Sequence, residues 1–357
     1  MKKVILLKGL DCLKILDERL EEILKEHRIA GMAVAITNKK CVVYQKGFGV
    51  DSIERPHIPA EADSLYRIAS ITKVVTGITI MRLVEKGVLN LDVLVKDYVP
   101  WLKLARNEAL EQMTLRHLLS HTSGLPKEYT PDGPKEESML EKSLKEELPV
   151  AEMKTLPNEG AYLYSNLGIR LASYIAERKT GQIFSTLAQE YVLNPLDMNK
   201  TTFDLRVAAT YPLSLPHEDA PDGSLKVFHH IKENAARLAA GGLYSNTTDL
   251  CKLVRFLLNN GVADSGERFL TQDSINQMFT RHALDRNGRD EQYGLTMLIK
   301  KYRNSYLYGH RGSAPPYALS MFVHPESRFG VVTLMNTQRD ELRFEIPKMI
   351  FNYLNDK

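Results

Sequence analysis

The chain is poor in cysteine. Its 357 residues include three cysteines, Cys12, Cys41 and Cys251, an odd number at wide spacing. Such a set does not form a disulfide framework, and there is no Cys-x-x-Cys pair to hold a metal. Few and scattered cysteines are typical of proteins in reducing compartments. The pattern therefore argues against a disulfide-stabilised secreted module.

Long hydrophobic runs and an excess of charge are also missing. The apolar run of residues 4–7 ends at Lys8 and is too short for the core of a signal peptide. No apolar run reaches the roughly 20 residues that span a bilayer. Lys and Arg total 47 against 44 Asp and Glu, a net charge of +3, with no basic stripe. We therefore expect a cytoplasmic protein with no membrane insertion and no nucleic-acid partner.

Three familiar catalytic or binding motifs are absent. The sequence has no Gly-x-Ser-x-Gly, so the nucleophile elbow of α/β-hydrolases is not used. It has no His-Glu-x-x-His, which leaves a zinc hydrolase poorly supported, and no Gly-x-x-x-x-Gly-Lys phosphate cradle. We therefore predict neither a metal nor a cofactor.

The patterns that are present predict a sheet built from both ends of the chain. Residues 11–27 form an amphipathic helical pattern, and two β-rich runs flank the polar residues 37–40, which is a hairpin signal. Near the other end, three β-rich runs precede a closing helix. These runs cover residues 305–312, 317–325 and 328–336, and the helix covers residues 340–355.

Residues 88–300 are mostly helical in pattern. We therefore predict an α/β fold of the α+β type, with a mainly antiparallel sheet flanked by helices and a helical lobe inserted. The whole chain, 1–357, is expected to be one catalytic domain in two lobes. Residues 1–87 and 300–357 would form the α/β lobe and residues 88–299 the helical lobe. A crevice between the lobes is where a site is expected.

A helix within residues 65–87 carries the first candidate site. From Ile68 to Met81 the only charge is Lys73, which lies three residues after Ser70. Residues three apart share a helix face. A buried lysine amine is acidified and can activate a neighbouring hydroxyl. The alternative is a lysine that extends its amine to solvent from a purely structural helix.

Two further motifs lie downstream. Tyr-x-Asn occurs four times, at residues 164–166, 244–246, 302–304 and 353–355. The last two are interpreted as structural, but the first two both read Tyr-Ser-Asn before a helix and cannot be separated by local pattern. His-x-Gly occurs at His310-Arg311-Gly312 inside a predicted strand, where a small residue lets a substrate backbone lie close.

Taken in order, these motifs resemble the serine β-lactamase-related superfamily, which includes class C β-lactamases, D-aminopeptidases, DD-peptidases and family VIII esterases. Ser70-x-x-Lys73, Tyr164-x-Asn166 and His310-x-Gly312 carry the resemblance, with phrases such as "MTLRHLLSHTSGL" and "YSNLGIRLAS". It covers residues 12–340 and favours Tyr164 over Tyr244 as the catalytic copy. The implied fold is that of β-lactamases and transpeptidases.

The resemblance implies a role for each residue. Ser70 would be the acylated nucleophile. Lys73 and Tyr164 would together remove the proton of Ser70 and return a proton to the leaving group. The two would titrate as a pair, and the base is left unassigned. Asn166 would hold Lys73 or the substrate. The backbone N–H groups of Ser70 and Ser313 would form the oxyanion hole.

One histidine of the family-like phrase "HTSG", His121, is interpreted as structural. His310 stands where penicillin-recognising relatives usually carry lysine. Histidine has an ordinary pKa of about 6.5, so we expect a mostly neutral imidazole near pH 7.5, a charged one toward pH 6, and weak binding of anionic substrates. Strand alternation should turn Arg311 to the face opposite His310.

The prediction is a serine hydrolase that forms an acyl-enzyme, an esterase or amidase acting on small molecules. A β-lactamase or D-amino-acid peptidase, and a non-catalytic penicillin-binding or sensing module, are kept as alternatives. The oligomeric state is left unknown.

Overall fold

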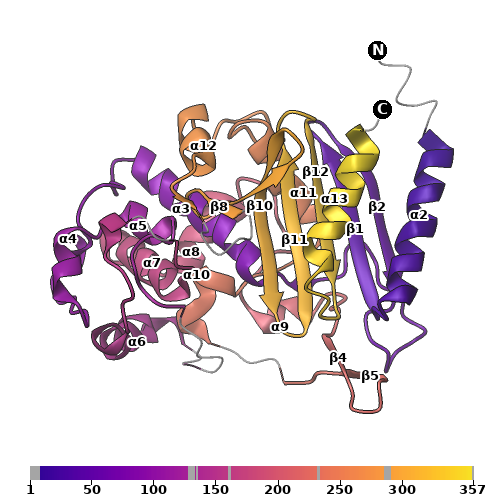
Figure 1. Ribbon diagram of the computed structural model, residues 1–357, viewed down its shortest axis with the longest axis horizontal. Helices are drawn as coiled ribbons and strands as arrows, with labels where there is room; N and C mark the ends of the chain where they lie inside the picture. Colours follow the sequence, from indigo (N-terminus) through magenta and orange to yellow (C-terminus); the bar gives the residue numbers. More distant parts are fainter. Residues whose placement is uncertain are drawn as a thin grey trace.

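The computed structural model of the protein describes residues 9–127, 133, 136–159, 162–230, 234–284 and 291–355. Its helices and strands form a mixed α/β fold around one large antiparallel sheet (Figure 1). The helices are α2 (Gly9–Glu26), α3 (Thr72–Glu85), α4 (Val95–Tyr98), α5 (Leu115–Leu119), α6 (Leu140–Glu147), α7 (Asn166–Thr180), α8 (Phe184–Ala188), α9 (Leu205–Ala208), α10 (Leu238–Gly241), α11 (Thr247–Leu258), α12 (Gln272–Phe279) and α13 (Leu342–Asn355).

The strands come from both ends of the chain, as the sequence predicted. They are β1 (Gly31–Asn38), β2 (Val42–Gly49), β3 (Tyr66–Arg67), β4 (His217–Asp219), β5 (Leu225–Val227), β6 (Tyr244–Ser245), β7 (Ala283–Leu284), β8 (Glu291–Tyr293), β9 (Leu298–Tyr302), β10 (Ser305–Ala314), β11 (Tyr317–His324) and β12 (Phe329–Met335). The main sheet has the order β2-β1-β12-β11-β10-β9-β8-β7, and its neighbouring strands are antiparallel. The predicted fold class is confirmed.

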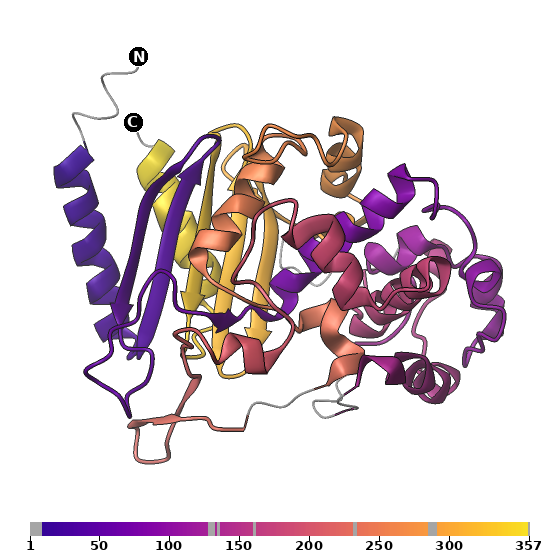
Figure 2. The ribbon, with the colours of Figure 1, turned by 180° about the vertical axis from the view of Figure 1, so that it is seen from behind.

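Two hydrophobic layers cover the sheet. In β1, Met32 and Val34 pack with α2 and α13, whereas Ala33 and Ala35 point to the opposite face and join the larger core. Helix α11 contacts β1 and β12 on that opposite face (Figure 2). Because both faces are covered, β1 lacks the polar alternation of a half-exposed strand.

Helix α3 connects the sheet to the helical part of the molecule. It contacts β10 on one side and α7, α8 and α10 on the other. Figure 1 shows α4 to α8 and α10 gathered beyond α3, away from the sheet. The N-terminal end of α3 therefore lies where residues from both parts can converge.

The strand assignment differs from the prediction in one region. Strands β7 and β8 and the first two residues of β9 precede residue 300, in a stretch that the sequence predicted to be helical. They are short, with two, three and five residues, and β9 carries the pair Lys300-Lys301. Such short strands show too little alternation to be recognised in a sequence.

Among the described residues, no helix has both the length and the apolar content needed to cross a bilayer.

Candidate active site

Ser70 lies in a tight turn just before α3. Residues Ala69–Ile71 form a 3₁₀ turn, and Ala69 has a φ of +48°, which is costly for a residue with a Cβ. Strand β3 enters this turn and pairs with β6. Strand β10 passes so close that a Cβ on Gly312 would lie 2.5 Å from the carbonyl oxygen of Ile68. Gly312 therefore permits the close approach of β10 to the turn that carries Ser70.

Lys73 is fully buried in the first turn of α3, so the alternative of a lysine extending to solvent is wrong. Its Nζ donates to Ser70 Oγ at 3.1 Å, to Asn166 Oδ1 at 2.9 Å and to the Ala240 carbonyl oxygen at 2.6 Å. The last two partners can only accept hydrogen bonds, whereas a serine hydroxyl can also donate. Asn166 and Ala240 thus fix the amine against the serine.

Tyr164 reaches the same serine from the segment before α7. Its hydroxyl donates to Ser70 Oγ at 2.8 Å, and Lys73 Nζ lies 5.0 Å from the centre of its ring. Burial raises the pKa of Tyr164 to about 12, despite the hydrogen bond to Ser70 and three nearby arginines that lower it. The tyrosine therefore holds its proton at neutral pH.

The two Tyr-Ser-Asn copies differ in which residue caps the next helix. In the first copy, Ser165 caps α7 by accepting from the Gly168 N–H, which leaves the Asn166 side chain to face Lys73. In the second, Asn246 itself caps α11 by accepting from the Asp249 N–H. A shift of one residue thus separates an amide beside Lys73 from a helix cap.

His310 lies in β10, as predicted, but its ring is held by protein groups. Nδ1 donates to the Arg311 carbonyl oxygen at 2.7 Å, and Nε2 accepts from the Tyr293 hydroxyl at 2.8 Å. Burial, with a contribution from Lys73, lowers the pKa of His310 to about 3. The expectation that this histidine becomes charged toward pH 6 is therefore wrong, because its environment excludes the cation.

Arginines provide positive charge beside the site. Arg343, from α13, donates to the Gly312 carbonyl oxygen at 3.5 Å. Arg311 pairs with Glu291 at 2.7 Å. Both lower the pKa of Tyr164, as does Arg237, so all three act on the site electrostatically. Arg343 was missed in the sequence because its role depends on α13 folding back against β10.

Two other groups had no usable signal in the sequence, and a third was singled out there but given a structural role. Ala240 contributes only a backbone carbonyl, so its side chain reveals nothing. Tyr293 lies in a three-residue strand that resembled a helical segment. His121 packs on Tyr164 with 4.4 Å between ring centres, and it was interpreted as merely structural.

Two of the predicted site residues contribute backbone in β10. Gly312 lies against the turn of Ser70, and Ser313 follows it with an exposed side chain. The oxyanion hole made by the N–H groups of Ser70 and Ser313 stays a prediction. Among the described residues, no three potential metal ligands gather at one place.

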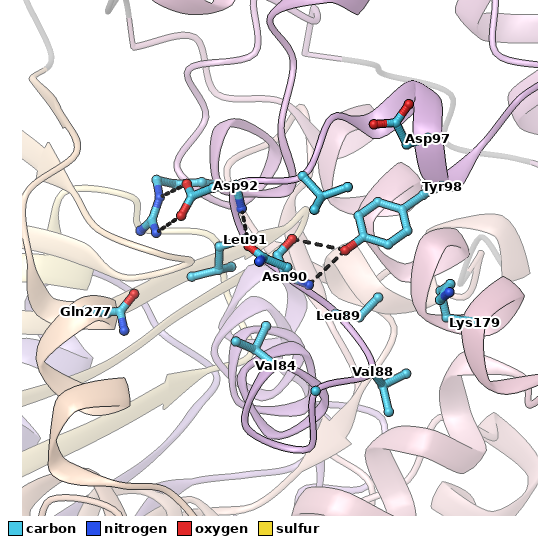
Figure 3. Close-up of a pocket in the computed structure, with 13 residues that line it drawn as sticks. Val84, Val88, Leu89, Asn90, Leu91, Asp92, Asp97, Tyr98, Lys179 and Gln277 are labelled. Atoms are coloured by element: carbon cyan, nitrogen blue, oxygen red, sulfur yellow. Dashed lines mark hydrogen bonds and ion pairs between the residues drawn. The ribbon is translucent and has the colours of Figure 1, made fainter.

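A separate pocket of about 590 Å³ lies at the far end of α3 (Figure 3). Val84, Val88 and Leu89 contribute apolar walls, and the Asp92–Arg116 ion pair lies at its edge. It shares no lining residue with the Ser70 cluster, and the 14 residues of α3 place it about 20 Å from Ser70. The pocket is therefore distinct from the candidate active site.

Two known proteins have a sequence similar to that of this chain. Protein flp from Staphylococcus aureus is 25% identical over 340 residues, which cover 94% of this chain and 64% of that protein. Beta-lactamase-like protein 2 from Dictyostelium discoideum is 28% identical over 295 residues, covering 79% of this chain and 51% of its own. The chain thus spans just under two thirds of the length of the first of these relatives.

Solved structures of other proteins have a similar fold. The octameric penicillin-binding protein homologue from Pyrococcus abyssi has a TM-score of 0.82 and 26% identity, covering 97% of this chain and 78% of its own. A D-stereospecific amidohydrolase from Streptomyces has a TM-score of 0.70 at 21% identity, covering 89% and 94%, and shows the shared fold. The family model described as Beta-lactamase matches residues 16–351, and the chain therefore belongs to the beta-lactamase family.

Proposed function

We propose that this protein is a serine hydrolase that forms an acyl-enzyme on Ser70 and acts on small esters or amides. The observation that supports this proposal is that Lys73 and Tyr164 both contact the hydroxyl oxygen of Ser70. Ser70 Oγ lies 3.1 Å from Lys73 Nζ and 2.8 Å from Tyr164 OH, at the start of a buried helix. A nucleophile with two proton-handling groups in hydrogen-bond range is what acyl transfer requires.

The hydrogen bonds of Lys73 suggest how the serine is activated. When Lys73 loses a proton, its two remaining hydrogens stay with Asn166 Oδ1 and the Ala240 carbonyl oxygen. Its lone pair then takes the place of the hydrogen bond that it donated to Ser70 Oγ. In that form, Lys73 takes the Ser70 proton as Oγ attacks the substrate carbonyl. The carbonyl oxygen becomes the oxyanion, which the N–H groups of Ser70 and Ser313 stabilise.

Tyr164 then serves as the acid. Its pKa of about 12 keeps the phenol protonated, and its hydroxyl lies beside the attacking oxygen. The phenol proton passes to the leaving group as the carbonyl re-forms, and the Lys73 ammonium returns a proton to the phenolate. Water then attacks the acyl-enzyme with the proton transfers in reverse.

The experiment combines labelling with kinetics on a panel of p-nitrophenyl esters, D-aminoacyl anilides and a chromogenic cephalosporin. We expect a fluorophosphonate probe to label Ser70 and no other serine. Ser70→Ala should abolish turnover, and Lys73→Ala and Tyr164→Phe should each lower kcat by at least ~100-fold.

Tyr244→Phe is the matched control, because it removes the same hydroxyl from the second Tyr-Ser-Asn copy and should change kcat by less than about threefold. A label on Ser123 or Ser313, or a large loss in Tyr244→Phe, would contradict the proposal. Efficient cephalosporin turnover would identify a β-lactamase instead. Binding without any turnover would identify the sensing alternative.

The remaining expectations belong to the same proposal. A small-molecule substrate and a cytoplasmic location fit the site and the scattered cysteines, of which Cys41 is exposed and Cys251 buried as free thiols. The division into two lobes fits the placement of Ser70 between the sheet and the helices α7 and α10.

A further inference from the structure

His121 is buried directly behind Tyr164. Its ring centre lies 4.4 Å from that of Tyr164 and 4.6 Å from that of Tyr293, so the imidazole is packed between two tyrosines. The side chain is fully buried. One of these tyrosines contacts the nucleophile, and the other holds His310 through its hydroxyl.

The same histidine binds the backbone on both sides of Tyr164. Its carbonyl oxygen accepts from the Leu163 N–H at 2.9 Å, and its Nδ1 accepts from the Ser165 N–H at 3.2 Å. Because Nδ1 accepts, the ring hydrogen is on Nε2 and the imidazole is neutral. Two backbone bonds and one ring contact therefore fix the position from which the phenol reaches Ser70.

Two features of His121 are energetically unfavourable. His121 has a φ of +58°, in the left-handed region that residues other than glycine uncommonly adopt. Its Nε2 has no hydrogen-bond partner among the described residues, although it is buried. An unsatisfied buried donor and a strained backbone together point to a function rather than to stability.

We propose that His121 is a positioning residue for catalysis, which holds the Tyr164 hydroxyl at Ser70 Oγ. This rests on the proposed function, in which Tyr164 is the proton donor. Catalytic groups must be held within about 0.5 Å of their productive position, and a displacement near 1 Å can cost ~100-fold in rate. His121 touches neither Ser70 nor Lys73 by hydrogen bonds and acts through Tyr164.

The test is a double-mutant cycle between His121→Asn and Tyr164→Phe. Asparagine tolerates a positive φ and offers an oxygen to the Ser165 N–H, but it lacks the ring that packs on Tyr164. With an active ester substrate, we expect His121→Asn to lower kcat by ~10-fold or more with KM within about twofold. In the Tyr164→Phe background, the same substitution should lower kcat by less than about twofold, because the hydroxyl it positions is gone.

His324→Asn is the matched control. His324 is also buried. Its Nε2 lies 2.6 Å from Ser305 Oγ and 3.4 Å from Glu326 Oε2, and its ring packs on Tyr302 and Phe351, away from the Ser70 cluster. It should leave kcat unchanged. If His121→Asn fails to fold, His121→Gln, which also offers an oxygen and lacks the aromatic ring, should give a loss that likewise vanishes in Tyr164→Phe.

An unchanged kcat in His121→Asn, or equal losses in both backgrounds, would overturn the positioning role and leave His121 as packing. The proposed function fails separately, through loss of Ser70 labelling or a silent Tyr164→Phe.

Discussion

At the scale of single residues, the charge around Ser70 comes from arginine rather than from histidine. His310 is kept neutral by burial, yet Arg343 lies against the carbonyl of Gly312, where a substrate backbone would pass. The prediction that anionic substrates bind weakly was based on His310 and Arg311 alone. A guanidinium that is mostly withdrawn from water binds a carboxylate more strongly than an exposed one.

We therefore predict that Arg343 selects for an acidic group on the substrate. Arg343→Met should lower kcat/KM for a p-nitrophenyl hemisuccinate by ~10-fold, while p-nitrophenyl acetate changes by less than about twofold. The comparison of the two esters in both proteins is the measurement. Lys348→Met, which removes a half-exposed cation from the same helix, is the control and should affect neither ester. Equal losses for both esters would show that Arg343 acts on the fold of the site instead.

The site residues that could be identified from the sequence are those that belong to a recognisable sequence motif. Ser70, Lys73 and Asn166 are brought together as their spacing and the family resemblance predicted. Tyr164 is hydrogen-bonded to Ser70 at 2.8 Å, and its choice over Tyr244 as the catalytic copy stays a prediction. By contrast, Ala240, Tyr293 and Arg343 act through tertiary contacts across more than a hundred residues or from another element, which no local pattern encodes.

At the scale of elements, long periodic segments were predictable and short ones were not. The 18 residues of α2 and the 14 of α13 have a clear apolar stripe, and both were predicted within about two residues of their ends. Strands β7 and β8 have two and three residues and take their conformation from pairing in the sheet. Their stability is tertiary, so their sequence alone does not reveal them.

The junction of α7 and α8 has an element-scale consequence. Glu177, near the end of α7, accepts the Phe184 N–H that opens α8 at 2.8 Å, and burial raises its pKa to about 7. Because the folded pKa exceeds the unfolded one, the stability that the protonated form gives is full below about pH 4.5 and is lost as pH rises through 7. At pH 8 the Glu177 carboxyl is ionised while partly buried, which lowers the free energy of unfolding.

We predict that Glu177→Gln stabilises the protein at pH 8 by ~1–2 kcal/mol, after allowance for partial exposure, and has little effect at pH 4.5. Glutamine still accepts from the Phe184 N–H. Thermal unfolding of both proteins at the two pH values is the measurement. Glu152→Gln removes an exposed carboxylate elsewhere in the chain and serves as the control. A gain of equal size at both pH values would rule out the charge as the cause.

At the scale of the whole molecule, several histidines that are wholly or partly buried make the fold sensitive to acid. Burial lowers the pKa of each of them in the folded chain. They are His117, His121, His217, His282, His310 and His324. The unfolded chain binds protons at these positions near pH 6.5 and the folded chain does not, so the free energy of unfolding falls as pH decreases below 6.5.

His310 gives the sharpest form of this prediction because its folded pKa is about 3. Between pH 7.5 and pH 5, a histidine with an unfolded pKa of about 6.5 should cost the folded state ~2 kcal/mol. In His310→Gln that part of the loss disappears, since glutamine does not titrate and still offers Tyr293 an acceptor. Urea unfolding at the two pH values compares the proteins, with His229→Gln as the control at a side chain that is 61% exposed. If His310→Gln loses as much stability on acidification as the unmodified protein, His310 is not held neutral, and the argument that arginine rather than histidine carries the positive charge of the site fails with it.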